Sequence, residues 1–198
     1  MKLVIHEDST YENFYPLSLI RPVFELRCGA TSLSEKLRSS FSNLDVAYFT
    51  RDYLTETFQT KVGNAPVNDL RAIDDDLFIV NGRWLCMNTQ ITAEGPEEIG
   101  VKEDSIVYVR VQQETVRKYL GQNINEFLST VLEVLPQKAV DEELVSYCWN
   151  IVHHNSEALV ADFQTLGQSG VQGEMHNLSC VYGDESQVFV ASEAVIHP

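Results

Sequence analysis

The chain begins with KLVIHED (residues 2–8), a short apolar run that ends directly at two carboxylates. A run of this length is typical of a buried strand, so we predict the first strand over residues 2–6. Glu7 and Asp8 would then follow its carboxyl end. In α/β sheets ligands bind outside the carboxyl ends of the strands, which makes these two residues the first candidates for a ligand cleft.

The same arrangement recurs along the chain. DVAYFT (45–50) and LFIV (77–80) are short apolar runs, and SIVYVRV (105–111) alternates apolar and polar residues as a further strand would. Helical patterns lie between or after these runs, at residues 32–41, 52–59, 123–135 and 144–166. Strands that alternate with helices indicate βαβ units and a mainly parallel sheet under helices.

Asn81, Gly82 and Arg83 follow the strand predicted over residues 77–80, so the strand-end rule places them in the same cleft as Glu7 and Asp8. The two carboxylates could hold Mg²⁺ or accept hydrogen bonds from a ribose or base; the alternative is a solvated loop start. Glycine at position 82 would let a ligand or another backbone come close. A plain turn explains the glycine equally well.

The segment PLSLIRPVFELRCGATSLSEKL (16–37) carries an unusual set of charges before a helix start. Arg21, Arg27 and Lys36 lie around this start, where free backbone N–H groups attract anions. Arginine forks suit bidentate phosphate recognition. The alternative is that Arg21 and Arg27 pair with Glu25 or other nearby carboxylates in an irregular loop.

The pattern at 144–166 is the longest helical one, with one apolar face predicted from Leu144, Cys148, Ile151, Leu159, Phe163 and Leu166. Asn155 falls on this apolar stripe, where a buried polar side chain must find a hydrogen-bond partner. It could break the helix, cap a second one, or reach into the cleft. His153 and His154 have no second ligand pair at a suitable spacing, so we expect them to be structural or surface residues.

Composition limits the partners. The 198 residues have 44% hydrophobic content and 22% charged content, as expected of one globular domain. The formal net charge of −15 argues against a nucleic acid polymer, because phosphate backbones recruit basic residues. No apolar run reaches the length of a membrane helix, and no signal peptide is recognised. Four widely spaced cysteines fit reduced thiols, so we expect a cytoplasmic protein without a membrane partner.

The C-terminal sequence VFVASEAVIHP (188–198) shows a six-residue period. Phe189 is followed six residues later by Val195, and Val190 by Ile196. This period is typical of a hexapeptide β-helix, although two hexads also fit an ordinary pair of strands. The pattern stops at Pro198 without completing a coil, so we expect a partial sequence.

Several of these stretches together resemble a known family. HEDSTYENFYPLSLIRPVFELRCGATSLSEKL (6–37), NGRWL (81–85), WNIVHHNSEALVADF (149–163) and the hexapeptide start resemble a divergent group of sugar nucleotidyltransferases. The group is similar to the uridylyltransferase domain of the bifunctional enzyme that forms UDP-N-acetylglucosamine in cell envelope biosynthesis.

The resemblance implies a three-layer, Rossmann-like α/β domain of the nucleoside-diphosphate-sugar type over residues 1–175, with a mainly parallel sheet. Residues 176–198 would form a linker and the first coil of a left-handed β-helix, through which a full-length parent would be a homotrimer. The implied reaction transfers a uridylyl group from UTP to N-acetylglucosamine 1-phosphate, or a related sugar phosphate, with Mg²⁺ and release of pyrophosphate.

The resemblance also implies roles for single residues. The catalytic candidates that would face the phosphates are Arg21, Arg27 and Lys36. The substrate-binding candidates are Glu7, Asp8, Asn81, Gly82, Arg83 and Asn155. No metal ligand is assigned from the sequence.

Two departures keep a second hypothesis open. The family's glycine-rich loop with a basic residue is replaced by HEDSTYENFY (6–15), and Arg83 stands where a metal-binding aspartate is expected. The alternative to an active transferase is therefore a non-catalytic sugar-nucleotide-binding or assembly domain that keeps the fold.

Overall fold

The fold is described from a computed structural model that covers residues 1–121 and 123–198. A six-stranded sheet lies at its centre in the order β4-β1-β5-β7-β6-β8. Its strands are β1 (Lys2–His6), β4 (Asp45–Phe49), β5 (Leu77–Asn81), β6 (Glu98–Lys102), β7 (Ser105–Val111) and β8 (Gln137–Ala139). β7 is antiparallel to β5 and β6, and the other neighbours are parallel, which confirms a mixed, mainly parallel α/β sheet.

The register of β1 fixes the edge at which a ligand can bind. His6, the last residue of β1, lies opposite Phe49 of β4 and Asn81 of β5. The carboxyl ends of these three parallel strands therefore meet at one level. The residues that follow them, starting with Glu7 and Thr50, emerge side by side.

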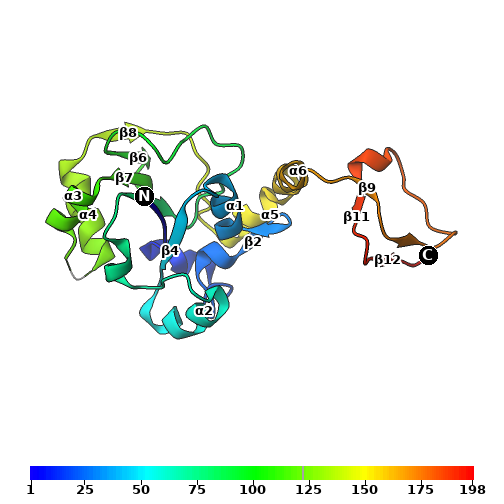
Figure 1. The fold of residues 1–198 in the computed structure, drawn as a ribbon, viewed down its shortest axis with the longest axis horizontal. Helices are drawn as coiled ribbons and strands as arrows, with labels where there is room; N and C mark the ends of the chain where they lie inside the picture. The colour runs from blue at the N-terminus through cyan, green and yellow to red at the C-terminus, as the bar shows by residue number, and fades with distance from the viewer. Residues whose placement is uncertain (122) are drawn as a thin grey trace.

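Helices cover both faces of the sheet because side chains alternate along each strand. Leu3 and Ile5 of β1 pack into one hydrophobic cluster, and Val4 packs into the other. The first cluster includes residues of α1 (Leu33–Ser40), α2 (Thr55–Val62), α5 (Cys148–His153) and α6 (Asn155–Leu166). The second includes residues of α3 (Gln113–Tyr119) and α4 (Ile124–Val134), which lie together at the left of Figure 1.

The helix predicted to start at Ser32 is confirmed. Ser32 caps α1 by accepting from the backbone of Glu35 at 3.2 Å, and Glu35 accepts from the backbone of Ser32 at 2.7 Å. This reciprocal capping box stabilises the first turn. Before α1, the chain forms two short 3₁₀ helices, η1 (Ser9–Phe14) and η2 (Val23–Glu25), and the hairpin of β2 (Arg27–Cys28) and β3 (Thr31–Ser32).

The region predicted as a helix over 52–59 contains a 3₁₀ turn, η3 (Asp52–Leu54), followed by α2, which continues to Val62. A further 3₁₀ helix, η4 (Leu70–Ile73), precedes β5. In the described part of the chain, no helix is long and apolar enough to cross a membrane.

The prediction of one helix over 144–166 is wrong. Leu144 lies in a β-bridge with Trp84, and the helix that starts at Cys148 is interrupted after His153. The buried residues of α6 are the alanines Ala158 and Ala161. Leu159 and Leu166 of the predicted apolar stripe are instead 46% and 48% exposed. Small side chains were needed there: a Cβ at Gly29 would lie 2.8 Å from the backbone of Ala158, so the hairpin and helix nearly touch.

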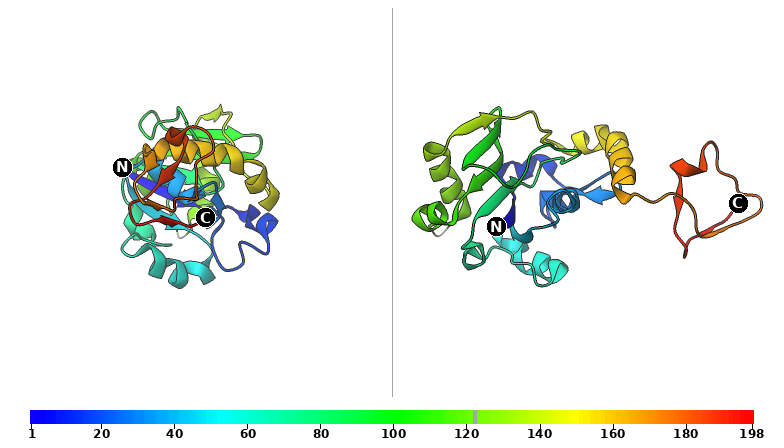
Figure 2. Two further views of the ribbon diagram at one scale, coloured as in Figure 1. Left: turned by 90° about the vertical axis from the view of Figure 1, so that its right-hand side faces the viewer. Right: turned by 45° about the horizontal axis from the view of Figure 1, so that its top comes forward.

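The C-terminal segment stands apart from the sheet domain (Figures 1 and 2). β9 (Gly170–Val171) pairs in parallel with β11 (Phe189–Val190), and β10 (Glu174–Met175) pairs in parallel with β12 (Val195–Ile196). The 3₁₀ helix η5 (Glu185–Gln187) precedes β11. The two later strands start six residues apart, as the hexad pattern predicts. Two such pairs do not establish a left-handed coil, which stays a prediction.

Candidate functional site

A cleft of about 1050 Å³ opens at the carboxyl ends of β1, β4 and β5. Residues at the start of η1 and in the first turns of α4 contribute to its walls. The strand-end rule therefore locates this cleft. The polar residues of the cleft used below are Glu7, Asp8, Tyr11, Thr50, Arg51, Asn81 and Asn125.

Asp8 caps η1 and is tied to the neighbouring strand. Its carboxylate accepts hydrogen bonds from the backbone and hydroxyl of Thr10 at 3.0 and 2.6 Å, and from the side-chain amide of Asn81 at 2.9 Å. The guanidinium of Arg83 donates to both carboxylate oxygens, with a shortest distance of 2.8 Å. Burial alone would raise the pKa of Asp8, but these bonds and the charge of Arg83 outweigh it and lower that pKa to about 2.

Arg83 is almost completely buried, with 4% of its side chain exposed. Besides Asp8, it donates to the backbone carbonyl of Val145 at 3.0 Å and weakly to the hydroxyl of Ser105 at 3.4 Å. The guanidinium thus connects the end of β1 to the segment before α5. Arg83 does not line the cleft, so it holds Asp8 from inside the protein.

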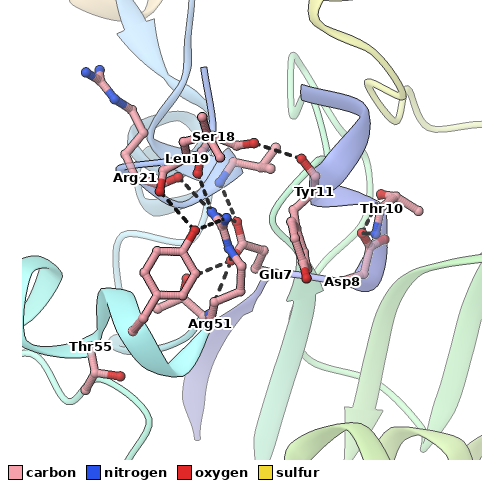
Figure 3. A network of polar contacts seen from close by, with 12 residues as sticks. Glu7, Asp8, Thr10, Tyr11, Ser18, Leu19, Arg21, Arg51 and Thr55 are labelled. Atoms are coloured by element: carbon pink, nitrogen blue, oxygen red, sulfur yellow. Dashed lines mark hydrogen bonds and ion pairs between the residues drawn. The ribbon is translucent and has the colours of Figure 1, made fainter. Parts of the chain in front are cut away.

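Glu7 is the centre of a second network (Figure 3). Its side chain is 1% exposed and forms an ion pair with Arg51, the second residue after β4, at 3.0 Å. It also accepts from the backbone of Val23 and the hydroxyl of Thr50, both at 2.7 Å. One buried carboxylate therefore joins the ends of β1 and β4 to η2.

These contacts test whether Glu7 and Asp8 fit the Mg²⁺ that the resemblance implies. A carboxylate offers about four lone-pair sites. Glu7 accepts from five donors, which belong to Val23, Thr50 and Arg51. Asp8 also accepts from five, and a guanidinium pairs with each carboxylate. Neither residue therefore fits a metal ligand, and the described residues contain no cluster of three or more metal-ligating side chains.

Gly82 serves the packing of the sheet end. Its backbone donates to the carbonyl of His6 at 2.7 Å, and a Cβ at this position would lie 2.7 Å from the ring of Phe24. The sequence left open whether a ligand or another backbone comes close at this glycine or whether the chain forms a plain turn. In the structure the nearest groups are the Phe24 ring, a side chain that was not predicted, and the backbone carbonyl of His6.

Five predicted residues, Glu7, Asp8, Asn81, Gly82 and Arg83, thus gather at one edge, whereas three others lie elsewhere. Lys36 is buried and pairs with Asp162 of α6 at 2.5 Å. Asn155 accepts from the backbone of Gly29 at 2.8 Å, and Arg27 donates to the carbonyl of Ala30 at 3.1 Å. None of the three lines the cleft: the bond of Lys36 attaches α6 to α1, and that of Asn155 attaches α6 to the β2–β3 hairpin.

Arg21 belongs to neither of these two groups. Its backbone carbonyl accepts from Arg51 at 2.9 Å, while its side chain is exposed and extends away from the Arg51 guanidinium (Figure 3). It borders a small pocket of about 240 Å³ beside the Glu25–Lys61 ion pair. Within the described chain its guanidinium has no hydrogen-bond or ion-pair partner.

Sequence reasoning missed Arg51 and the α4 wall. Arg51 directly follows the run predicted as a strand over 45–50, so the same strand-end rule could have found it. The α4 wall joins the site through His6, whose Nε2 lies 2.8 Å from the Oδ1 of Asn125. Burial lowers the pKa of His6, and the neutral ring can donate to that oxygen. No local signal links residues 119 positions apart in the sequence.

The chain is thus an α/β protein with a polar cleft at the carboxyl ends of its strands, the edge at which open α/β sheets bind their ligands. Residues 3–170 match the family model of sugar nucleotidyl transferases, and the chain belongs to that family. The sequence has no significant match among curated proteins.

Solved structures with a similar fold include two nucleotidyltransferases. One, from Bacillus anthracis, is described as a glucose-1-phosphate thymidylyltransferase and was solved with a sucrose; the TM-score is 0.52 at 11% identity, over 80% of this chain and 95% of that one. The other is the CTP:phosphocholine cytidylyltransferase of Streptococcus pneumoniae, also with a TM-score of 0.52 and 11% identity, over 79% and 98%. At this identity the likeness concerns the fold alone.

Proposed function

We propose that the chain is an active sugar-1-phosphate nucleotidyltransferase whose reaction takes place in the cleft at the ends of β1, β4 and β5. Family membership supports the reaction class. The observation that carries the location is that the cleft, of about 1050 Å³, lies at the edge where the strand ends converge. A cleft of this size has room for a nucleotide and a sugar phosphate together.

The proposed chemistry is an in-line displacement. An oxygen of the sugar 1-phosphate attacks the α-phosphorus of the nucleoside triphosphate and forms a new P–O bond. The bond between the α-phosphorus and the oxygen that bridges it to the β-phosphate breaks, and pyrophosphate leaves with that electron pair. Such transfers depend on alignment and charge neutralisation rather than on a protein nucleophile. We therefore assign no nucleophile to the chain.

We assign the residues at the site to two tasks. Glu7, Asp8, Asn81, Gly82 and Arg83 form the framework of the cleft, because their polar groups are bonded to each other and to nearby backbone. Arg21, whose guanidinium is unpaired in the described chain, is the proposed phosphate ligand. We assign a structural role to Lys36 and Asn155 at the contacts of α6, and to Arg27 within the β2–β3 hairpin. Because Glu7 and Asp8 do not fit Mg²⁺, no step is assigned to a protein-bound metal.

The substrate pair we propose first is UTP with N-acetylglucosamine 1-phosphate. The similar structures carry the names of thymidylyl and cytidylyl transferases, so the assay has to vary both substrates. Pyrophosphate release is measured with four nucleoside triphosphates against a panel of sugar 1-phosphates and phosphocholine. Turnover with one pair supports the proposal and identifies the substrates. Absence of turnover with every pair, from protein shown to be folded, contradicts it.

A non-catalytic sugar-nucleotide-binding domain is the second candidate. The observation in its favour is that both strand-end carboxylates are saturated by the protein's own donors. The two candidates differ in one measurement: a binding domain would show heat of binding for a UDP-sugar by calorimetry and no pyrophosphate release with any pair.

We also propose that the paired strands between residues 170 and 196 form the first coil of a left-handed β-helix. Val190, which is 9% exposed, is the buried aliphatic residue of this segment. Replacing it by Asp should raise hydrogen exchange in the backbone of β9 and β11 and leave the exchange of β1 and β5 unchanged. Equal exchange in the variant and the parent protein would contradict the coil.

A further inference from the structure

The loop between η1 and η2 has few apolar anchors. Tyr15, Leu17, Leu19 and Ile20 are 42%, 50%, 47% and 72% exposed, so these side chains contribute little to holding the loop on the protein. Of residues 15–21 only Ser18 is buried, and its side chain is polar. Polar contacts must therefore fix the course of the loop over residues 15–21.

Those contacts converge on Arg51 (Figure 3). Its Nη2 donates to the carbonyl oxygen of Ser18 at 2.6 Å and to that of Arg21 at 2.9 Å. Its Nη1 donates to the hydroxyl of Tyr53 at 2.6 Å, and that hydroxyl donates to the carbonyl of Leu19 at 2.9 Å. Three backbone carbonyls of the loop are thus held directly or through one intermediate.

The guanidinium of Arg51 is itself held in place. Its Nε and Nη2 donate to the two oxygens of Glu7 at 3.0 and 3.2 Å, and its central carbon lies 4.4 Å from the ring centre of Tyr11. Tyr11 lines the cleft, and its backbone carbonyl accepts from the hydroxyl of Ser18 at 2.8 Å. The same guanidinium therefore supports both the loop and the cleft wall formed by η1.

The hydrogen-bond count shows that Arg51 supports the cleft and is not free to bind a ligand. A guanidinium has five N–H donors. The acceptors around Arg51 are the two Glu7 oxygens, two loop carbonyls and the Tyr53 hydroxyl, which together engage its Nε, Nη1 and both hydrogens of Nη2. At most one N–H, on Nη1, remains for a ligand.

We propose that Arg51, oriented by Glu7, is a positioning residue that fixes the loop 15–21 and with it Arg21, whose unpaired guanidinium borders the smaller pocket. This inference rests on the proposed function insofar as Arg21 binds phosphate. The planar fork of arginine reaches acceptors on two sides, and the single ammonium of lysine cannot reproduce this geometry.

The first test is hydrogen exchange measured by mass spectrometry on Arg51→Lys, a variant that keeps the charge. We expect peptides covering 15–21 to exchange about tenfold or more faster, because bonds from a charged donor are lost. Peptides of β5 should not change. The matched control is Arg117→Lys, which alters an exposed Arg–Asp pair distant from the loop. Unchanged exchange at 15–21 in Arg51→Lys overturns the inference.

The second test asks whether the support acts on Arg21. In the wild type, Arg21→Ala should lower kcat/KM for the nucleotide about tenfold or more, the effect of losing a charged hydrogen-bond donor. In the Arg51→Lys background the same change should lower it less than threefold, because Arg21 is already misplaced there. Equal effects in both backgrounds overturn the inference, since a purely structural Arg51 would give additive losses.

A milder variant keeps the inference testable if Arg51→Lys does not fold. Tyr53→Phe removes the bridge to Leu19 and leaves the bonds of Arg51 to Glu7, so the loop exchange should rise by less than in Arg51→Lys. Different results would contradict the proposed reaction and the proposed role of Arg51. A wild-type protein without turnover contradicts the proposed reaction, and the Arg21 cycle is then measured with nucleotide dissociation constants. Unchanged loop exchange contradicts the role of Arg51 whatever the activity.

Discussion

Replacement of Asp8 by Asn removes the charge of the strand-end carboxylate and keeps its shape, because an amide resembles a protonated carboxyl group. We predict that this variant is destabilised at neutral pH. The reason is the buried partner: Arg83 has 4% of its side chain exposed and donates to both Asp8 oxygens. Without Asp8 its charge stays buried with only carbonyl and hydroxyl acceptors.

The magnitude follows from the pKa of Asp8. A decrease from 3.8 to about 2 stabilises the ionised folded state by on the order of 2 kcal/mol, at about 1.4 kcal/mol per pKa unit. The uncompensated guanidinium adds to this value, since breaking a buried pair typically destabilises by about 3–5 kcal/mol in total. We therefore expect Asp8→Asn to lose about 2–5 kcal/mol of unfolding free energy at pH 7.

The pH dependence gives a second, independent number. A carboxyl whose pKa is lowered by folding stabilises the protein fully above its unfolded value, and this stabilisation is lost as the pH falls through its folded value. For Asp8 the window lies between pH 4 and pH 2. The wild-type advantage over Asp8→Asn should therefore fall by on the order of 1 kcal/mol between pH 7 and pH 3.

The assay is urea unfolding at pH 7 and pH 3, followed by the fluorescence of the buried Trp84 and interpreted with a common m-value. Asp74→Asn is the matched control, because Asp74 pairs with Arg117 on the surface and should have little effect. Arg83→Gln combined with Asp8→Asn should lose less than the two single variants together. A variant as stable as the wild type at pH 7, or equally destabilised at both pH values, would show that the Asp8–Arg83 pair does not stabilise the fold.

Three further perturbations test other parts of the argument. Gly82→Ala places a methyl group 2.7 Å from the ring of Phe24, so thermal unfolding should show a loss of about 1–3 kcal/mol. Lys36→Met leaves the Asp162 carboxylate without its buried partner and should lower the free energy of unfolding by about 3 kcal/mol. Turnover per folded molecule in the pyrophosphate assay should stay at the wild-type value. Loss of turnover in the folded fraction would give Lys36 a catalytic role instead. Glu7→Gln should leave the Mn²⁺ affinity of the free protein unchanged in an electron paramagnetic resonance titration, because Glu7 has no lone pair left for a metal; a weaker affinity would show that it is a ligand.

Local patterns were sufficient to predict the framework of the sheet. The strand predicted over residues 2–6 is β1, and that predicted over 105–111 is β7, because apolar periodicity depends only on which side chains face the core. The Ser32–Glu35 capping box is equally local, and α1 starts where it predicts. The strand-end rule then placed Glu7, Asp8 and Asn81 at one edge without any structural information.

What the sequence did not reveal depends on contacts between distant segments. β6 and β8 are short or carry mixed polarity, and they are held by pairing rather than by a strong pattern of their own. The leucine stripe over 144–166 was misleading because α6 meets the β2–β3 hairpin through alanines. Lys36 looked like a phosphate ligand from its position at a helix start, but its partner is 126 residues away.

We propose that the cleft binds phosphates although the chain carries a formal net charge of −15. Its two strand-end carboxylates would repel a triphosphate if they faced it unpaired. Each is instead engaged by a guanidinium, Glu7 by Arg51 and Asp8 by Arg83, so the floor of the cleft combines fixed charges of both signs. Preorganised pairs of this kind need little rearrangement when a charged ligand arrives. The residues that sequence analysis found most readily are therefore bonded to the protein itself, and we propose that contacts with substrate are made by other groups, among them Arg21 and residues of α4.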